Sequence, residues 1–143
     1  MPKTRKSAWG AKMAVAAFTA AASIATFAAP AFANEISFYN WYGSNFSFDT
    51  TLTGSTRYYD LDNIGCDFYS YSDGEGAQST FKLTLYRKNI IGATPVETKI
   101  MKRTGDNKAD WYGVGAGDYF FYFSKTYDGV TVKSDAMGMY SWD

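Results

Sequence analysis

Residues 80–87 read Thr-Phe-Lys-Leu-Thr-Leu-Tyr-Arg, and along this stretch apolar and polar side chains alternate. A period of two places Phe81, Leu83 and Leu85 on one face of a β-strand, whereas a helix would need apolar residues three or four positions apart. Alternation, or enrichment in β-branched and aromatic residues, recurs on both sides of this stretch. The further segments that show it are 46–52, 64–71, 96–102, 119–123, 130–133 and 137–142.

Turn-forming residues separate these segments, and no window after residue 33 carries a sustained apolar stripe at helical spacing. Asp128-Gly129 predicts a tight hairpin between 119–123 and 130–133, because both central residues of such a turn take positive φ. The sequence therefore predicts an all-β fold: a single antiparallel β-sandwich of about seven or eight short strands, of immunoglobulin, fibronectin or jelly-roll type. The other predicted turns are Thr53-Gly54-Ser55, Ser72-Asp73-Gly74 and Gly105-Asp106-Asn107.

One of these segments carries a resemblance to known modules. Gly117-Asp118-Tyr119-Phe120-Phe121 follows a glycine-rich loop. It resembles the G-x-Y-x-F start of a late strand in secreted sandwich modules of the immunoglobulin-like, fibronectin-like and prepeptidase C-terminal kinds. The resemblance implies that Tyr119 packs across the end of the sandwich and that its hydroxyl caps the backbone. It supports the fold class and implies no activity.

The first 33 residues have the three features of a secretory signal peptide in the right order. A basic start without acids precedes an alanine-rich apolar run over 13–29, and Ala31-Phe32-Ala33 forms a small-x-small cleavage site. The run, about 17 residues long, is at the lower limit for a membrane span. We therefore expect a signal peptide over 1–33, a β-sandwich domain over 34–143 and no transmembrane segment after cleavage. The product would be secreted, free or loosely associated with the cell wall.

Loss of segment 1–33 changes the charge balance. All 14 acidic residues but only ten of the 14 basic ones lie in 34–143, which leaves this part with a net charge of −4. A mildly acidic chain has no electrostatic attraction for nucleic acid, so no nucleic-acid partner is expected. The sequence has no histidine, which excludes a Ser-His-Asp triad, a Cys-His pair and histidine-ligated zinc. Since no catalytic motif is present either, the sequence predicts a protein that is not an enzyme.

The single cysteine excludes an internal disulfide framework. Cys66 alternates with Ile64 and Phe68 on an apolar face, so we expect its thiol to be buried in the core. The alternative is a disulfide to a second molecule.

A calcium site is the one cofactor that the sequence brings into consideration. Asp60, Asp62 and Asn63 resemble the start of a calcium-binding loop, but Ile64 and Tyr71 stand where further ligands are required. A looser site could add ligands from 73–75, and a solvated acidic turn is the favoured interpretation. No other metal or cofactor is expected.

Aromatic residues are the most informative part of the composition. They make up 19% of the chain, and a domain of this size cannot bury all of them. Tyrosine and tryptophan rings at the surface stack on flat ligands such as sugar rings, while neighbouring amides and carboxylates bond hydroxyl groups. The ligand-binding candidates are Asn40, Trp41 and Tyr42, near Asn45, and Trp111 and Tyr112, beside Asp110.

These observations predict a small secreted, non-catalytic binding module. Its partner would be cell-envelope or extracellular glycan, or a protein on a surface. Two alternatives remain at this point: a bacteriocin-like secreted antagonist, and an extracellular structural or assembly protein that pairs through edge strands or through Cys66.

Overall fold

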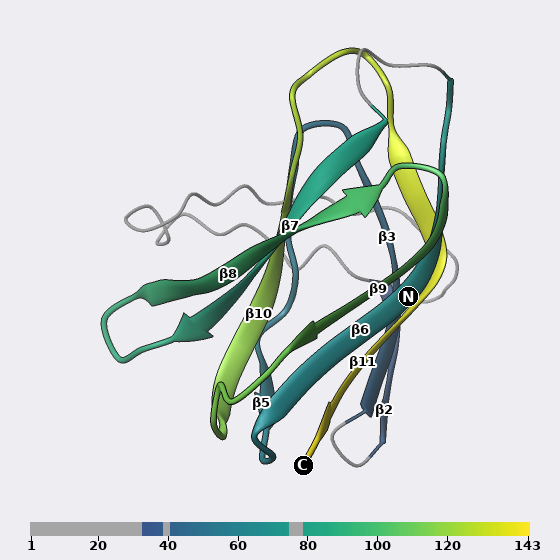
Figure 1. Ribbon diagram of the computed structural model, residues 1–143. Coiled ribbons are helices and arrows are strands. Elements are labelled where there is room, and N and C mark those ends of the chain that lie inside the picture. The colour runs from purple at the N-terminus through teal and green to yellow at the C-terminus, as the bar shows by residue number, and fades with distance from the viewer. Residues whose placement is uncertain (1–32, 39–40, 75–78) are drawn as a thin grey trace.

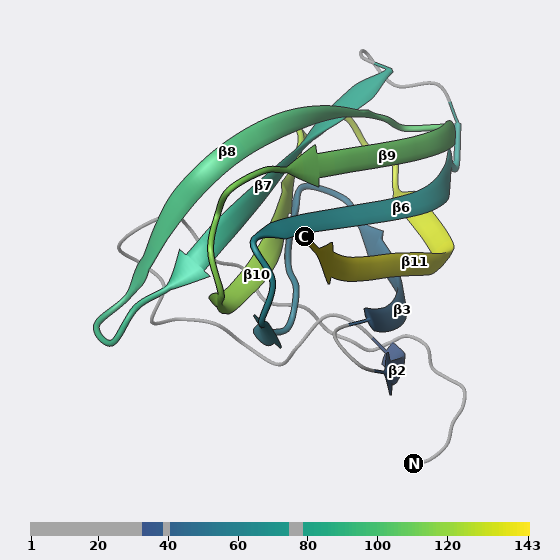
Figure 2. The ribbon, with the colours of Figure 1, turned by 60° about the horizontal axis from the view of Figure 1, so that its bottom comes forward.

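The computed structural model describes residues 33–38, 41–74 and 79–143, with side chains described from residue 41 onward. These residues form ten strands, in two antiparallel five-stranded sheets packed face to face as a β-sandwich (Figures 1 and 2). This confirms the predicted all-β class. Within the described residues there is no helix, and hence no helical segment able to cross a membrane. The predicted signal peptide, 1–33, lies outside the described residues except for Ala33.

The two sheets are called sheet I and sheet II. Sheet I contains, in spatial order, β2 (Ala33–Phe38), β3 (Trp41–Phe48), β11 (Val132–Trp142), β6 (Asn63–Ser72) and β9 (Gly105–Trp111). Sheet II contains β4 (Thr51–Thr53), β10 (Gly117–Ser124), β7 (Thr80–Lys88) and β8 (Ala93–Lys102), and β5 (Arg57–Tyr59) also pairs with β10.

Phenylalanine rings fill most of the space between the sheets. Phe46 of β3 meets Phe123 of β10 with ring centroids 4.7 Å apart, and Phe81 of β7 lies edge-on to Phe48 at 5.3 Å. These rings belong to one continuous cluster of buried side chains. Cys66 is fully buried in the same cluster, which confirms the expected burial of its thiol.

The predicted segments did not include β2, β5 or β9, and the structure differs from the predicted strands and turns at three further points. Segment 46–52 is divided at Asp49-Thr50, because β3 belongs to sheet I and β4 to sheet II. Gly105-Asp106-Asn107 opens β9 instead of forming a turn, although Gly105 has a positive φ of +130°. Segments 130–133 and 137–142 are joined in one strand, β11.

The tight hairpin predicted at Asp128-Gly129 is also wrong. β10 belongs to sheet II and β11 to sheet I, so residues 125–131 cross from one sheet to the other. Gly129 does take a left-handed conformation, with φ +78°. The local turn chemistry was therefore recognised correctly, whereas the partner of each strand is a non-local property.

The structure confirms the role implied for Tyr119. Its ring is buried, and its hydroxyl lies 2.6 Å from the Val114 carbonyl oxygen and 2.8 Å from that of Gly115. The Arg87 guanidinium donates to the same hydroxyl at 2.6 Å and to the Ala116 carbonyl at 2.8 Å. Tyr119 and Arg87 thus fasten the glycine-rich loop to the end of sheet II, the arrangement called a tyrosine corner in other sandwiches.

Candidate functional site

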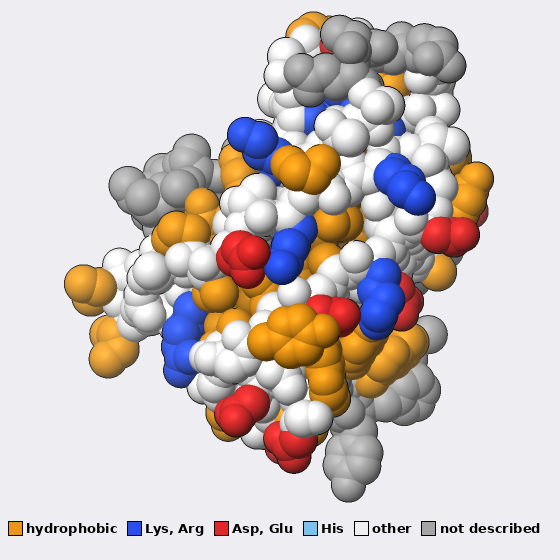
Figure 3. Space-filling view, viewed as in Figure 1, with side chains coloured by type: hydrophobic (Ala, Val, Ile, Leu, Met, Phe, Trp, Pro, Cys, Tyr) orange, Lys and Arg blue, Asp and Glu red, His pale blue; other side chains and the backbone are white. Residues whose placement is uncertain are grey.

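An open groove of about 860 Å³ crosses the outer face of sheet I. In Figure 3, hydrophobic, acidic and basic side chains lie beside one another where β6, β9 and β11 run in Figure 1. We call this feature the outer groove. Its lining is formed by Trp41, Gly43, Ser44, Asn45, Asp67, Phe68, Tyr69, Asp106, Asn107, Lys108, Asp135, Ala136, Met137 and Gly138.

Strand register places Gly43 and Gly138 side by side on the outer face of sheet I, and we call this pair the glycine floor of the outer groove. Gly43, Gly138, Asp67 and Lys108 face one another in a single row across β3, β11, β6 and β9. A Cβ atom on Gly138 would lie 3.3 Å from an Asp67 carboxylate oxygen and 3.4 Å from the Trp41 ring. Glycine at this position therefore lets the indole lie across β11.

Two partly exposed aromatic rings line the outer groove, and one of them, Trp41, lies over Gly138 of this floor. Trp41, 39% exposed, occupies the next row toward the start of β3, and Tyr69, 53% exposed, occupies the next row on the other side. From ordinary strand dimensions the two positions are separated by roughly 13 Å along the strands and about 10 Å across them. Because the Trp41 ring reaches Gly138, which lies between these two positions, the rings themselves are closer together than the backbone positions.

A β-bulge in β11 shapes the end of the groove near Tyr69. β11 carries one extra residue between Ser134 and Met137 relative to both neighbouring strands, and Asp135 and Ala136 occupy this bulge. The Tyr71 hydroxyl donates to the Asp135 carboxylate at 2.9 Å. Bulges in a ladder re-aim side chains and occur often beside functional sites. Here the bulge orients a carboxylate at the rim of the outer groove.

The charged side chains of the outer groove are mostly acidic. Asp67, Asp106 and Asp135 contribute carboxylates, and Lys108 contributes the ammonium group. Lys108 donates to the Tyr140 hydroxyl at 2.8 Å, and this hydrogen bond raises the pKa of Lys108, which is therefore protonated at neutral pH. The groove thus offers carboxylate and amide acceptors to hydroxyl groups and repels anionic ligands.

The structure separates the residues of the first predicted patch. Trp41 and the neighbouring Asn45 line the outer groove. Tyr42 points to the opposite side of β3, where its hydroxyl donates to the Tyr58 carbonyl at 2.8 Å and its ring packs edge-on against Tyr59. Asn40 lies outside the described residues. Of this patch, only Trp41 therefore remains a described candidate for stacking on a ligand.

The second predicted patch requires a correction. Trp111 is 1% exposed, because it lies on the inner face of β9, packs against Phe121 and donates its indole N–H to the Glu97 carbonyl at 3.0 Å. Tyr112 follows the strand, is exposed and packs edge-on against Trp142. The two neighbours are thus on different sides of sheet I, and Trp111 is a core residue.

The predicted calcium turn has a structural use in the fold. The Asp62 carbonyl accepts the backbone N–H groups of Val114 and Gly115, and the Asn63 side-chain oxygen accepts that of Gly113 at 2.8 Å. Among the side chains of residues 41–74 and 79–143, no three acidic or cysteine groups lie close enough to hold a metal ion. Asp60 is exposed beside this turn. Calcium binding stays a prediction without support from this geometry.

The sequence analysis missed Tyr69, Asp135 and the glycine floor as site residues. Tyr69 could have been predicted, because Asp67, Tyr69 and Tyr71 alternate with the core residues of β6 and therefore lie on its outer face. The other features depend on the register of β11 against two strands distant in sequence.

Comparison of the chain with protein-family models finds no match, and comparison with curated proteins finds none either.

Proposed function

We propose that the protein is a secreted, non-catalytic binding module, a sandwich of the immunoglobulin, fibronectin or jelly-roll kind, whose outer groove holds a non-anionic glycan of the cell envelope or extracellular matrix. The observation that carries this proposal is the pair of partly exposed rings, with Trp41 over the glycine floor and Tyr69 in the row next to it. Tyrosine and tryptophan rings are enriched where proteins contact ligands and partners.

The remaining groove residues fit the same ligand class. Aromatic rings bind the apolar faces of sugars, and the carboxylates of Asp67 and Asp106 with the amide of Asn45 accept hydrogen bonds from hydroxyl groups. Because the groove has more acidic than basic side chains, polyanions such as phosphate-rich wall polymers are disfavoured. The acidic balance thus excludes polyanions and leaves neutral and cationic glycan chains as ligands.

The test is co-sedimentation of the purified protein with insoluble neutral polysaccharides and with purified cell walls. Trp41→Ala and Tyr69→Ala are each expected to weaken saturable binding about tenfold or more, the effect of removing one aromatic anchor. Tyr127→Ala removes an exposed ring outside the groove and serves as the matched control. Full binding by both groove variants, with an unchanged far-ultraviolet spectrum, would refute the proposal.

A further inference from the structure

The tip of the β7–β8 hairpin exposes two isoleucines to solvent. This hairpin extends away from the rest of the sandwich at the left of Figures 1 and 2. Ile90 is fully exposed and Ile91 is 96% exposed, more than any other large apolar side chain in the described part of the chain. Side chains exposed to this degree add nothing to the core, so their presence needs another explanation.

Isoleucine is an unfavourable residue at both positions of this turn. Lys88 pairs with Ala93, and Asn89 donates its backbone N–H to the Gly92 carbonyl at 2.7 Å, which leaves Ile90 and Ile91 as the two turn residues. Two-residue hairpin turns favour Asn, Asp and Gly at these positions and disfavour β-branched residues. A local rule broken without a gain in packing is typical of a functional position.

The stem of the hairpin, by contrast, has features that prevent another β-strand from pairing with its exposed edge. β8 is the edge strand of sheet II, and it carries Pro95, which has no N–H to donate. A register shift against β7 places an extra residue at Val96, and Lys99 adds a charge. Proline, bulges and lysine are the devices that discourage another strand from adding to an edge. The hairpin is therefore built for contact through its tip rather than along its edge.

Charge is distributed unevenly between this hairpin and the rest of the chain. Residues 80–102 contain five basic residues and one acidic residue, whereas the remainder of 34–143 contains five basic and thirteen acidic residues. Lys88 stands two residues before the tip and is exposed. The stem is held to the body at Arg87, whose guanidinium bonds the Val114 and Ala116 carbonyls. Lys82 and Lys102 lie at the opposite end of the hairpin and Lys99 pairs with Glu97, so Lys88 is the exposed basic group beside the apolar tip.

We propose that Ile90 and Ile91 insert into the apolar boundary of an anionic lipid bilayer, with Lys88 at the level of the headgroups. A two-residue apolar tip is far smaller than the roughly 800 Å² per partner that a stable protein interface buries. It does suit shallow insertion into lipid, where apolar burial and attraction of basic side chains to anionic headgroups act together. This contact is independent of the outer groove, which lies on sheet I.

The test begins with a fluorescent probe at the tip. Ile91→Cys is labelled with an environment-sensitive dye, and Cys66 stays unlabelled because it is buried. Vesicles of equal parts phosphatidylcholine and phosphatidylglycerol are expected to shift the dye emission to the blue, and vesicles of phosphatidylcholine alone to do so more weakly. The same dye on Ser79→Cys, at the far end of the hairpin, is expected to report water throughout. Tip emission that does not change with any vesicle would overturn the proposal.

A second pair of variants separates insertion from folding. Ile90→Asn combined with Ile91→Gly installs the favoured turn residues, so the hairpin is expected to fold at least as well as before. Its partition onto the anionic vesicles is expected to fall about tenfold or more, while its binding to polysaccharide is unaffected. Ile100→Asn removes an exposed isoleucine from the stem and is the matched control, with unchanged partition. Equal partition by the tip variant and the native protein would exclude insertion.

Discussion

Two tryptophans show that the face of a strand on which a side chain lies decides the role of that side chain. Trp41 projects from the outer face of sheet I over a glycine floor, while Trp111 projects from the inner face of the same sheet into the core. Their local sequences are alike, since each is followed by a tyrosine. Trp111 shares its face with Ala109, and this alternation could have placed it correctly from sequence had β9 been recognised as a strand.

Tyr119 leads to a prediction at the residue scale. Replacement of Tyr119 by phenylalanine removes the hydroxyl that bonds two loop carbonyls and accepts from Arg87, so buried polar groups lose their partner. The free energy of unfolding is expected to fall by about 1–3 kcal/mol, measured by urea titration of intrinsic fluorescence. Tyr127→Phe, at an exposed ring, is expected to stay within about 0.5 kcal/mol of the native protein. Equal losses in the two variants would contradict this role for Tyr119.

At the element scale, the bulge in β11 leaves the packing of the inward-facing side chains regular and changes only the outward-facing side of the strand. The inward residues Val132 and Ser134 precede it, and Met137 and Met139 follow it. Without the extra residue these four would still alternate with outward ones. The bulge is therefore unnecessary for the core, and its effect falls on Asp135 at the groove.

Deletion of Ala136 tests this interpretation of the bulge. The inward set keeps its period of two, so the protein is expected to fold, with loss of about 1 kcal/mol from the hydrogen bond between the Ser134 hydroxyl and the Ala136 carbonyl. Polysaccharide binding is expected to fall about tenfold because Asp135 is redirected. Thermal unfolding followed by circular dichroism checks the first outcome and co-sedimentation the second. Native binding by the deletion variant would show that the bulge has no part in recognition.

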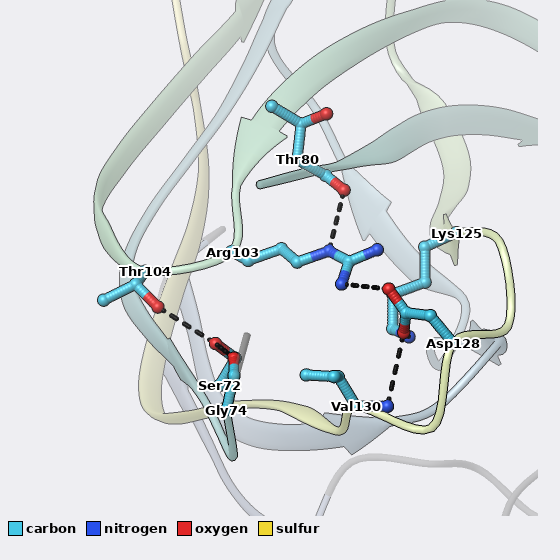
Figure 4. A network of polar contacts seen from close by, with 8 residues as sticks. All are labelled: Ser72, Gly74, Thr80, Arg103, Thr104, Lys125, Asp128 and Val130. Atoms are coloured by element: carbon cyan, nitrogen blue, oxygen red, sulfur yellow. Dashed lines mark hydrogen bonds and ion pairs between the residues drawn. The ribbon is translucent and has the colours of Figure 1, made fainter. Parts of the chain in front are cut away.

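The segment that crosses from β10 to β11 is held by a buried ion network, drawn in Figure 4. Arg103 and Lys125, both buried, contact the two carboxylate oxygens of Asp128 at 2.6 and 3.0 Å. Arg103 also donates to the Thr80 carbonyl at 3.0 Å, and the Val130 N–H donates to Asp128. The network thus joins the start of β7, the β8–β9 turn and the crossing segment.

Asp128 gives the stability of the protein an acid dependence. The hydrogen bonds from Arg103 and then Lys125 hold the pKa of Asp128 well below that of an ordinary carboxyl. Because the pKa of Asp128 is lower in the folded state, the ionised carboxylate stabilises the folded protein. This stabilisation is complete above the unfolded-state pKa of about 4 and is lost as the pH falls below it. Asp128→Asn is expected to lower the melting temperature at pH 7 and to flatten the fall in stability below about pH 4. Equally steep acid profiles for the two proteins would contradict this assignment.

Much of the architecture could be predicted from the sequence, and the reasons for the failures are physical. Period-two patterns identified the strands whose inner faces are strongly apolar, such as β7 around Leu83 and Leu85. They missed β9, where the inward set begins with the polar Asn107, which bonds Ser70 and the backbone of Lys102. Strand partners, the bulge and hence the outer groove depend on contacts between distant segments, which local periodicity does not encode.

At the scale of the whole molecule, two surfaces of opposite character lie on different sheets. The outer groove of sheet I is predominantly acidic, and the hairpin of sheet II is basic with an apolar tip. Between them lies a closed core of aromatic and aliphatic side chains that includes Cys66. A ligand at either surface therefore contacts the body of the protein without access to the core.

The reactivity of the Cys66 thiol measures how well the core is closed to solvent. Burial raises the pKa of its thiol, and the nearby Asp67 and Asp110 raise it further, so little thiolate forms at pH 8. In native buffer we expect no reaction with a thiol-specific reagent and a single monomer mass without reductant. In urea, labelling is expected to follow the global unfolding transition measured by fluorescence. Rapid labelling of the native protein, or a dimer that reductant dissolves, would contradict the buried position.

The placement of the tryptophans makes the molecule its own optical reporter. From residue 34 onward the chain has three: Trp41 in the outer groove, Trp111 in the core and the half-buried Trp142 near the C-terminus. An indole in contact with solvent emits at longer wavelength and is quenched by dissolved iodide. An enclosed indole emits at shorter wavelength and is protected from iodide. The red side of the emission band thus responds to occupancy of the groove and the blue side to the integrity of the fold, so one unlabelled sample reports both.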